Sequence, residues 1–424
     1  MSNNQTLEND DVKYIPELRF SEFAKPWVSC DLSTITEKPL YGMNAAAKEF
    51  DGENKYLRIT DINEETRLFD TSKLTSPDGE LDNKYLLTQG DLLFTRTGAS
   101  VGKTYLYKEN DGKVFFAGFL IKFKLKPCVI PEFIFYQTLT SSYSAWIKKT
   151  SVRSGQPGIN AEEYSGLKVM NTSRKEQQKI VNCLLQLDKL IQTELNKLDK
   201  LQDHKNGLLQ NLFPNSGENS PRLRLSEFDQ KWENIELSQI AKPVKKKNST
   251  GKEIKVLSLS NEHGLVSQAD YFLKKVAGDN TDRYIVLQKN DFVYNDRITK
   301  NSTYGTIKRL SLYESGVVSP IYKCFRFEKN QNPVFWEYFF ESKTHESEIK
   351  QIVNEGARAG RYNISIDKFL SINVMQPSLP EQEKIAYCLT SLDRLISNQT
   401  NYIEQLKKHK KGLIQQLFPV VEEI

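Results

Sequence analysis

The stretch EQQKIVNCLLQLDKLIQTELNKLDKLQDHKNGLLQNLFP, residues 176–214, returns near the end of the chain as EQEKIAYCLTSLDRLISNQTNYIEQLKKHKKGLIQQLFP, residues 381–419. The two copies align without a gap at an offset of 205, and 20 of 39 positions are identical. Apolar residues recur in each copy with alternating steps of four and three, the spacing of a coiled-coil seam. The sequence therefore predicts two equivalent long helices that pair with one another.

Each predicted seam is interrupted at two polar positions, and these fall at the same places in both copies. They are Glu194 and Lys205 in the first helix, and Gln399 and Lys410 in the second. A parallel, in-register pair would place Lys205 against Lys410, two like charges in one layer, so the sequence favours antiparallel pairing. At 1.5 Å per residue, each helix would be about 55 Å long.

The repeat continues outside the helices. PELRFSEFAKPWVSCDLSTI (16–35) matches PRLRLSEFDQKWENIELSQI (221–240), and RSGQPGINAEEYSGLKVM (153–170) lies over RAGRYNISIDKFLSINVM (358–375). Similarity fades between these anchors. A period near 205 residues is far too long for a solenoid, so it indicates a duplicated domain pair with a pseudo-two-fold axis.

The divergent middles mix strand and helix signals. Residues 114–126 and 317–327 are rich in the aromatic and branched residues of strands, whereas 131–149 and 333–353 begin at proline and carry apolar residues at helical spacing. We therefore predict an α+β, or mixed α/β, fold in which two similar globular domains are separated by two long antiparallel helices that form a coiled coil. The predicted domains are 1–170 and 215–375, and the predicted helical segments are 171–214 and 376–424.

The composition is that of a globular protein with free thiols. The 424 residues are 38% hydrophobic and 27% charged, with a net charge of +5, which permits a nucleic-acid partner without requiring one. No apolar run approaches the roughly 20 residues that cross a bilayer. The five cysteines are scattered and form no CxxC pair, so we expect a cytoplasmic protein without a membrane segment, a disulfide framework or a zinc site.

Sequence patterns for catalysis are missing. TGASVGKTYLY (97–107) has Thr97 where a phosphate loop needs glycine, and the following TYLYK alternates like a strand, so a turn into a strand is predicted instead. Lys103 could still contact another kind of phosphate. No Pro-Pro dipeptide of a DNA methyltransferase occurs, and the four histidines form no triad or cluster. We expect no catalytic residue, no metal site and no cofactor in this chain.

Additional apolar residues widen the stripe at both ends of each predicted helix. They are Cys183, Leu190, Leu209 and Phe213 in the first helix, and Cys388, Leu395, Ile414 and Phe418 in the second. Antiparallel pairing brings one helix's start beside the other's end, and each such end is then wider than two helices need. Either the neighbouring domains cover these residues, or the residues form two equivalent docking sites for partner helices.

An ordered set of motifs, present twice, resembles the specificity subunit of type I restriction–modification enzymes over essentially the whole chain. EQQKI and EQEKI, GLLQNLFP and GLIQQLFP, GDLLFTRTGASVGKTYLY (90–107), and NDFVYNDRITKNSTYGTIKRL (290–310) followed by GVVSPIYKCFRF carry the resemblance. It implies a non-catalytic subunit in which each variable domain is a target-recognition domain that reads one half of a bipartite double-stranded DNA target. The helices would hold the readers apart and bind two modification (methyltransferase) subunits, joined by restriction (translocase and nuclease) subunits. S-adenosylmethionine, ATP and magnesium would belong to those partners.

Base edges are read by Arg, Lys, Asn and Gln, and phosphates by basic side chains, small hydroxyls and backbone N–H groups. The candidates of these types are Arg58, Arg96, Thr97, Ser100, Lys103, Arg153 and Gln156 in the first domain, and Asn295, Arg297, Lys300, Asn301, Tyr304, Arg358 and Arg361 in the second. Any one of them could instead be solvated surface. The alternative function is a non-catalytic, two-headed scaffold that binds proteins, which the helices alone would suit equally well.

Overall fold

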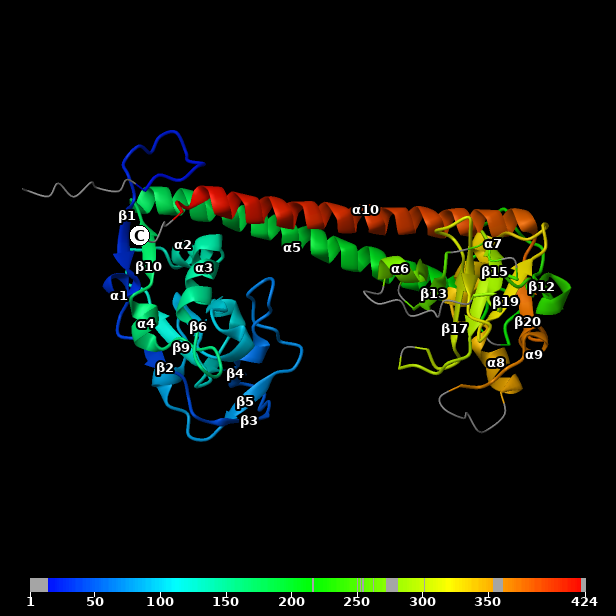
Figure 1. The fold of residues 1–424 in the computed structure, drawn as a ribbon, viewed down its shortest axis with the longest axis horizontal. Helices are drawn as coiled ribbons and strands as arrows, with labels where there is room; N and C mark the ends of the chain where they lie inside the picture. The colour runs from blue at the N-terminus through cyan, green and yellow to red at the C-terminus, as the bar shows by residue number, and fades with distance from the viewer. Residues whose placement is uncertain are drawn as a thin grey trace, which may run out of the picture. The chain divides into compact units, whose positions relative to one another are not determined.

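The computed structural model describes residues 14–215, 217–249, 251, 253, 255–261, 263–271, 281–300, 302–353 and 361–420. The chain divides into two compact units, Met1–Glu194 with Tyr402–Ile424, and Leu195–Asn401. Each unit combines a globular head with parts of two long helices, α5 (Arg174–Asn211) and α10 (Leu379–Leu417). Figure 1 shows the two helices and the labelled elements of each head.

Head 1, residues 28–171, is built around a four-stranded antiparallel sheet in the order β2-β9-β6-β7. Its strands are β1 (Val28–Asp31), β2 (Leu40–Tyr41), β3 (Ala46–Glu49), β4 (Lys55–Leu57), β5 (Thr75–Asp78), β6 (Asp91–Thr95), β7 (Thr104–Leu106), β8 (Val114–Phe116), β9 (Leu120–Lys124) and β10 (Lys168–Asn171). Its helices are α1 (Leu32–Ile35), α2 (Pro131–Gln137), α3 (Ser141–Thr150) and α4 (Ala161–Ser165), with short 3₁₀ turns η1 (Ile59–Asp61), η2 (Asn83–Tyr85), η3 (Gly98–Ser100) and η4 (Glu109–Asp111). Pairs β3–β5, β4–β8 and β1–β10 complete the head.

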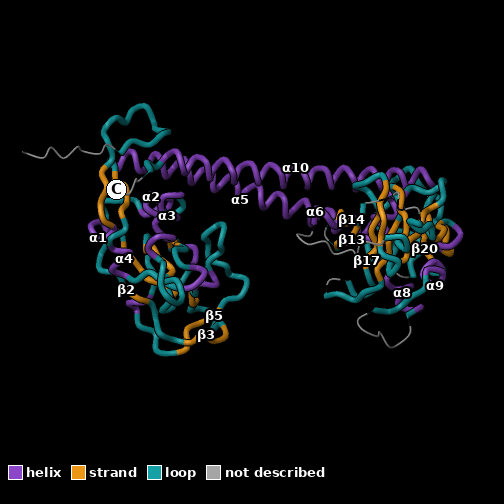
Figure 2. The backbone as a smooth tube through the Cα atoms, in the orientation of Figure 1, coloured by secondary structure: helices purple, strands orange, loops and turns teal. Residues whose placement is uncertain are grey.

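Head 2, residues 233–376, repeats this plan with a four-stranded sheet in the order β12-β19-β16-β17 and the pair β11–β20. Its strands are β11 (Glu233–Glu236), β12 (Ala241–Pro243), β13 (Leu257–Ser260), β14 (Gly264–Ser267), β15 (Ile285–Gln288), β16 (Phe292–Asn295), β17 (Thr306–Arg309), β18 (Ser315–Val318), β19 (Lys323–Phe327) and β20 (Asn373–Gln376). Its helical elements are η5 (Leu237–Gln239), α6 (Gln268–Tyr271), α7 (Pro333–Glu341), α8 (Glu346–Ile352) and α9 (Ile366–Leu370). Helices and strands are interspersed in both heads (Figure 2), which confirms the predicted mixed α/β class.

The predicted long elements of the heads are each divided in two. Strand 114–126 becomes β8 and β9, because the chain turns between Ala117 and Leu120, whose backbone N–H donates to the Ala117 carbonyl. Helix 131–149 becomes α2 and α3, because the Thr140 hydroxyl accepts from the Tyr143 N–H and starts a new helix. In head 2, the corresponding break between α7 and α8 contains Lys343 at φ +66°, outside the helical region.

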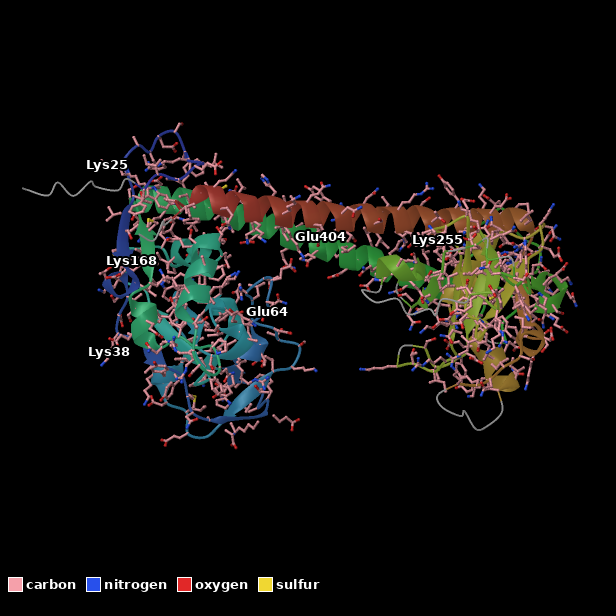
Figure 3. All side chains as sticks on the ribbon, in the orientation of Figure 1. Lys25, Lys38, Glu64, Lys168, Lys255 and Glu404 are labelled. Atoms are coloured by element: carbon pink, nitrogen blue, oxygen red, sulfur yellow. The ribbon has the colours of Figure 1, made fainter. Side chains whose placement is uncertain are left out.

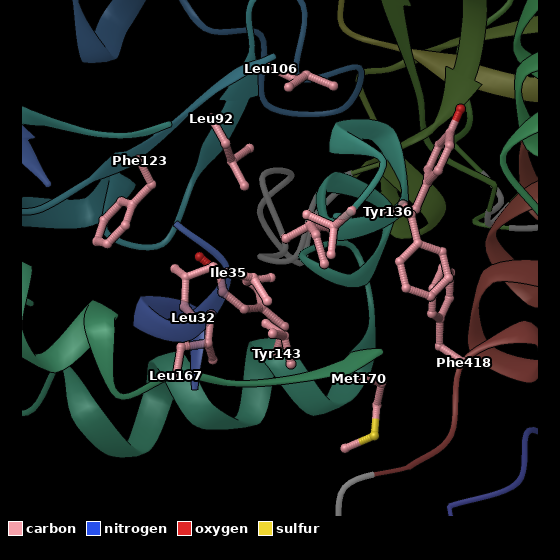
Figure 4. Packing of buried hydrophobic residues seen from close by; sticks show 14 of the residues in the cluster. Leu32, Ile35, Leu92, Leu106, Phe123, Tyr136, Tyr143, Leu167, Met170 and Phe418 are labelled. Carbon is pink, nitrogen blue, oxygen red and sulfur yellow. The ribbon is translucent and has the colours of Figure 1, made fainter. Parts of the chain in front are cut away.

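The two long helices pair antiparallel in each unit. In the first unit, Ile180, Val181 and Leu184 from the start of α5 share one buried cluster with Leu417 and Phe418 from the end of α10. Figure 4 shows this cluster, with Phe418 among head residues that include Tyr143 and Met170. In the second unit, Leu209 of α5 and Leu212, just after it, share a cluster with Ile385 and Leu389 from the start of α10. The predicted coiled-coil seam and orientation are confirmed.

The two seam lysines make equivalent ion pairs across the helix pair. Lys410 of α10 pairs with Asp188 of α5, while Lys205 of α5 pairs with Asp393 of α10 at 2.8 Å. The two ion pairs belong to one register of the antiparallel helices. From Asp188 to Lys205, α5 advances by 17 residues, and from Lys410 to Asp393, α10 goes back by 17 residues. A lysine in the seam is thus tolerated because a carboxylate on the partner helix faces it.

Each of these aspartates also accepts a hydrogen bond from a tyrosine of its head, on α2 in head 1 and on α7 in head 2. Tyr136 of α2 donates to Asp188 at 2.7 Å, and Tyr338 of α7 donates to Asp393 at 2.6 Å. Burial, followed by the nearby carboxylate, raises the pKa of both tyrosines, so both stay protonated donors. The lysine lies over the same ring, 5.4 Å from the Tyr136 centroid and 5.5 Å from that of Tyr338. One polar cluster therefore joins a head to both helices.

A buried carboxylate at the start of each helix joins the helix to the segment that precedes the head. Glu176 is 1% exposed; it accepts from the Arg19 guanidinium at 2.7 and 2.9 Å and from the Trp27 indole at 3.1 Å. Glu381 accepts in the same way from Arg224, at 2.8 Å twice, and from Trp232 at 3.1 Å. We call each arrangement a joint. These residues are the shared identities of the two repeats, so the joint is what the repeat preserves.

Each joint also holds the end of the second helix. The Leu18 N–H donates to the Gln416 carbonyl at 2.9 Å, and the Leu223 N–H donates to the Asn211 carbonyl at 2.9 Å. Helix ends leave carbonyls without intrahelical partners, and the segment before each head supplies a donor to one of them. The start of one helix, the end of the other and the base of the head are thus tied by one short segment in each unit.

We predict that Glu176→Ala lowers the free energy of unfolding of the first unit by about 3–5 kcal/mol, because it leaves the largely buried Arg19 guanidinium, 11% exposed, without its carboxylate. Equilibrium urea unfolding of the full chain followed by tryptophan fluorescence measures this change. The matched control is Glu22→Gln, which removes an exposed ion pair with Lys179 and is expected to cost about 0–1 kcal/mol. Equal effects of the two substitutions would contradict the role given to the joint.

The same joint predicts a dependence on pH. Burial alone would raise the pKa of Glu176, but hydrogen bonds from Arg19, Thr172 and Trp27 outweigh it and lower the pKa below the ordinary 4.5. The charged form therefore stabilises the fold above the unfolded-state pKa, and this contribution is lost as the pH falls through the lowered folded-state pKa. Glu176→Gln should flatten this acid dependence of the urea midpoint.

Candidate nucleic-acid interface

Two loops that the sequence singled out meet in head 1. The segment after β6 runs antiparallel to the glycine-containing segment before α4, with an isolated bridge between Thr97 and Gly158. The Gly98 N–H donates to the Pro157 carbonyl at 2.9 Å, and the Ile159 N–H donates to the Arg96 carbonyl at 2.9 Å. We call this the loop bridge. It brings the predicted DNA-binding group at 96–100 beside the group at 153–156.

Head 2 contains the same loop bridge with different side chains. Arg297 pairs with Arg361 in an isolated bridge, and the Tyr362 N–H donates to the Asp296 carbonyl at 3.3 Å. The predicted residue Tyr304 stacks on Tyr362, with ring centroids 6.1 Å apart and planes inclined by 12°. Asp296, which is fully buried, binds the Lys323 ammonium at 2.6 Å and the Arg361 guanidinium at 3.4 Å.

Several of the predicted basic residues of head 1 are already held by acidic groups. Arg58 makes a two-pronged contact with Asp61, at 2.8 Å for each nitrogen, and this hydrogen bonding raises the pKa of the guanidinium. Arg153 is exposed and pairs with Glu163. Lys103 is 5% exposed, and its ammonium lies 2.5 Å from Glu64 and 3.0 Å from the Ile62 carbonyl, so it faces the interior. Figure 3 labels Glu64 on the loop after η1.

Arg96 is held differently. Its guanidinium lies over the Tyr41 ring, 5.0 Å from the centroid, and no acidic group of the described residues is found within ion-pair distance. Thr97 and Ser100 are half-buried beside it, and Gln156 is exposed. The Gln156 amide lies over Gly98, where an added Cβ would come within 2.8 Å of its nitrogen. The loop bridge of head 1 therefore presents two side chains, Arg96 and Gln156, of the types that read base edges.

The remaining candidates in head 2 lie around its loop bridge. Arg297 and Lys300 are exposed, and the Asn295 Oδ1 atom is buried without a hydrogen-bond partner among the residues that the structure describes. Asn301 and Arg358 lie outside the described residues. No finding places DNA on any of these residues, so the DNA-binding assignments stay predictions.

The predicted partner-binding residues divide into two groups. Leu209 and Phe213 are buried in the core of the second unit, and Ile414 and Phe418 are buried in that of the first, so the heads cover them. Cys183 is half-buried and Cys388 is exposed. Leu190 and Leu395, which occupy equivalent positions, are 37% and 55% exposed. Of the two groups, the second presents apolar surface at the helices, and its contact with a partner stays a prediction.

Sequence reasoning missed three participants in these sites. Tyr41 supports Arg96, Asp61 holds Arg58, and Asp296 holds Arg361. Asp61 stands three residues from Arg58, a spacing at which a partner could have been suspected. Tyr41 and Arg96 are joined only by the tertiary fold, and the sequence carries no signal for that contact.

Neither a metal-binding cluster nor a membrane-spanning helix occurs among the described residues. No group of three or more His, Cys, Asp or Glu side chains that could hold a metal ion occurs among them. Within the same ranges, every helix is too short or too polar to span a bilayer.

Comparison with known proteins identifies the family. The model of the type I restriction modification DNA specificity domain matches residues 30–203 and again residues 229–408. A curated relative, the type I restriction enzyme MjaVIII specificity subunit of Methanocaldococcus jannaschii, is 22% identical over 351 residues, which cover 78% of this chain and 79% of that protein. The two family matches coincide with the two repeats found in the sequence.

Solved structures share the fold. The type I restriction–modification S subunit from M. genitalium aligns with a TM-score of 0.54 and 16% identity, covering 96% of this chain and 100% of that one. A chain solved in a study of complex assembly and conformational transition of the type I R-M system aligns with a TM-score of 0.55 and 12% identity, over 93% and 97% of the two chains.

The family match over both repeats thus places this two-headed protein in the DNA-specificity class. The chain belongs to the type I restriction modification DNA specificity family, and its role is that of a specificity subunit, as the sequence predicted.

Proposed function

We propose that each head reads one half of a bipartite double-stranded DNA target and that partner subunits carry out methyl transfer and cleavage. One observation carries this proposal: the same backbone bridge occurs in both heads but presents different side chains. Head 1 offers Arg96 and Gln156, whereas head 2 offers Arg297, Arg361 and a tyrosine pair. A shared scaffold with unlike side chains suits two unlike half-sites.

The partners follow from this division of labour. S-adenosylmethionine, ATP and magnesium would be bound by the modification and restriction subunits, and the complex would work in the cytoplasm. The two-fold repeat of the helices, with Leu190 and Leu395 exposed at equivalent positions, supports the binding of two modification subunits. The curated relative bears the name of a specificity subunit, which agrees with a non-catalytic chain.

Exchange of one head tests the proposal. Residues 32–167 of head 1 would be replaced by those of a relative, with the joins placed where Asp31 and Lys168 pair at the ends of β1 and β10. The joint at Glu176 stays intact in this chimera. Methylation-site mapping in cells should show that one half of the target changes while the other half and its bases persist. Changes in both halves would contradict one reader per half-site.

A scaffold that binds only proteins is the alternative, and the exposed apolar residues of the helices would suit it. Salt dependence separates the two, because neutralising Z phosphates releases counterions and gives log K against log salt a slope of about −0.9Z. We expect the purified specificity–methyltransferase complex to bind duplex DNA with a steep negative slope in fluorescence anisotropy. Binding that is absent or independent of salt would support the scaffold.

We predict that Leu190→Asp together with Leu395→Asp prevents assembly with two modification subunits, because an unpaired carboxylate in an apolar helix interface costs several kcal/mol. Mass measurement of the purified complex reports the stoichiometry. The control is Thr193→Asp with Asn398→Asp, which adds the same charge at equivalent exposed positions of the same helices. Full assembly of the leucine variant would show that the modification subunits bind elsewhere.

A further inference from the structure

The loop bridge of head 1 contains one arginine with no acidic partner among the described residues, whereas the other arginines of the head, Arg58, Arg67 and Arg153, each have one. Arg58 is bound to Asp61 and Arg153 to Glu163, and the buried Lys103 is bound to Glu64. Arg96 is half-buried, and its guanidinium lies over the face of Tyr41 without a hydrogen bond or ion pair to another described residue. A partly desolvated guanidinium without a carboxylate keeps all five of its N–H donors for another acceptor.

Tyr41 is itself fixed in place. Its hydroxyl accepts a hydrogen bond from the Ala161 N–H at 3.0 Å, at the first residue of α4. Its ring is therefore tied to the segment that forms the other side of the loop bridge. A guanidinium that lies over a fixed ring has fewer orientations open to it, and a restricted orientation favours a two-pronged hydrogen bond.

The equivalent position in head 2 shows what happens when this arginine is absent. Asp296 follows the central strand β16 as Arg96 follows β6, and Asp296 is a buried carboxylate that holds Arg361 from across the loop bridge. In head 1, Gly158 is the residue that pairs with Thr97 across the bridge, and the repeat aligns Arg361 with Gln156. Each loop bridge thus contains one half-buried arginine, supplied by opposite strands in the two heads. This exchange places the two guanidinium groups differently on a common backbone.

We propose that Arg96 is the base-specifying residue of head 1 and that it reads a guanine through its O6 and N7 atoms in the major groove. The inference rests on the proposed function. Guanine is the base whose major-groove edge carries two adjacent acceptors, which match two parallel guanidinium donors. A phosphate would accept the same donors, but it would give no base preference, so the two acceptors are distinguished by their effects.

The experiment compares variants of the full specificity–methyltransferase complex. Arg96→Gln removes the two-pronged donor, and Tyr41→Leu removes the supporting ring, whereas Tyr41→Phe keeps the ring and loses only the hydroxyl. Lys108→Gln is the charge-matched control, because it also removes one positive charge. Lys108 is exposed and follows β7, so it lies near the start of β6, whereas Arg96 follows the end of β6. Binding to duplexes that carry each of the four base pairs at each position is measured by competition, and methylation sites are mapped in cells.

We expect the wild-type complex to require a G·C pair at one position in the half-site of head 1. Arg96→Gln should reduce the preference for that pair by roughly 5- to 150-fold and leave the head 2 half-site unchanged. Tyr41→Leu should reduce the same preference more than Tyr41→Phe does, and Lys108→Gln should leave it intact. Unaltered circular dichroism and an unaltered head 2 half-site show that each variant is folded.

Two results would overturn the inference while leaving the proposed function in place. One is a head 1 half-site without a required G·C pair. The other is an Arg96→Gln complex whose affinity falls equally for all sequences, which is the behaviour of a phosphate contact. If the wild-type complex shows no bipartite target at all, the proposed function fails and this inference fails with it.

Discussion

Everything in each unit depends on one buried carboxylate at the start of a long helix. Glu176 and Glu381 each accept hydrogen bonds from a guanidinium and an indole. The segment that carries these two donors also binds the end of the second long helix, so all these parts meet in one joint. An unpaired carboxylate in that place would cost several kcal/mol, so the arginine and the glutamate are needed together. This mutual need explains why both survive in repeats whose heads have diverged.

The helix pair adds a second constraint. Apolar seam residues would pair well in more than one register, whereas a seam lysine requires a carboxylate opposite it. Lys205 meets Asp393 and Lys410 meets Asp188, and the two pairs agree on one register. Burial lowers the pKa of Lys205, but the carboxylates of Glu341 and Asp393 outweigh it and raise the pKa, which keeps the charge on the ammonium. The tyrosines Tyr136 and Tyr338 then connect each aspartate to its head.

Much of the architecture could be predicted because it repeats. The offset of 205 exposed the helices, their seam and the segments around Arg19 and Arg224 without any coordinates. The breaks inside the heads could not be predicted as well, because a turn such as that at Ala117 or a new start at Thr140 depends on single hydrogen bonds. The apolar pattern also could not predict that Leu190 is exposed while Phe213 is buried, because both are apolar residues beside the same seam. Only the packing of the heads separates them.

Divergence between the heads is possible because the sheet and the loop bridge are stabilised independently of the side chains that face outward. Asp91 and Asp291 are both fully buried at the start of the central strand, and each accepts the N–H of the residue three positions earlier, Thr88 at 2.9 Å and Gln288 at 2.7 Å. At the other end of the same strand, backbone hydrogen bonds close the loop bridge, and these bonds place no demand on side chain type. The same backbone arrangement can therefore carry an arginine over a tyrosine ring at position 96 and a buried aspartate at position 296. A reader of this construction can change what it recognises while its joint, its helices and its strand anchors stay as they are.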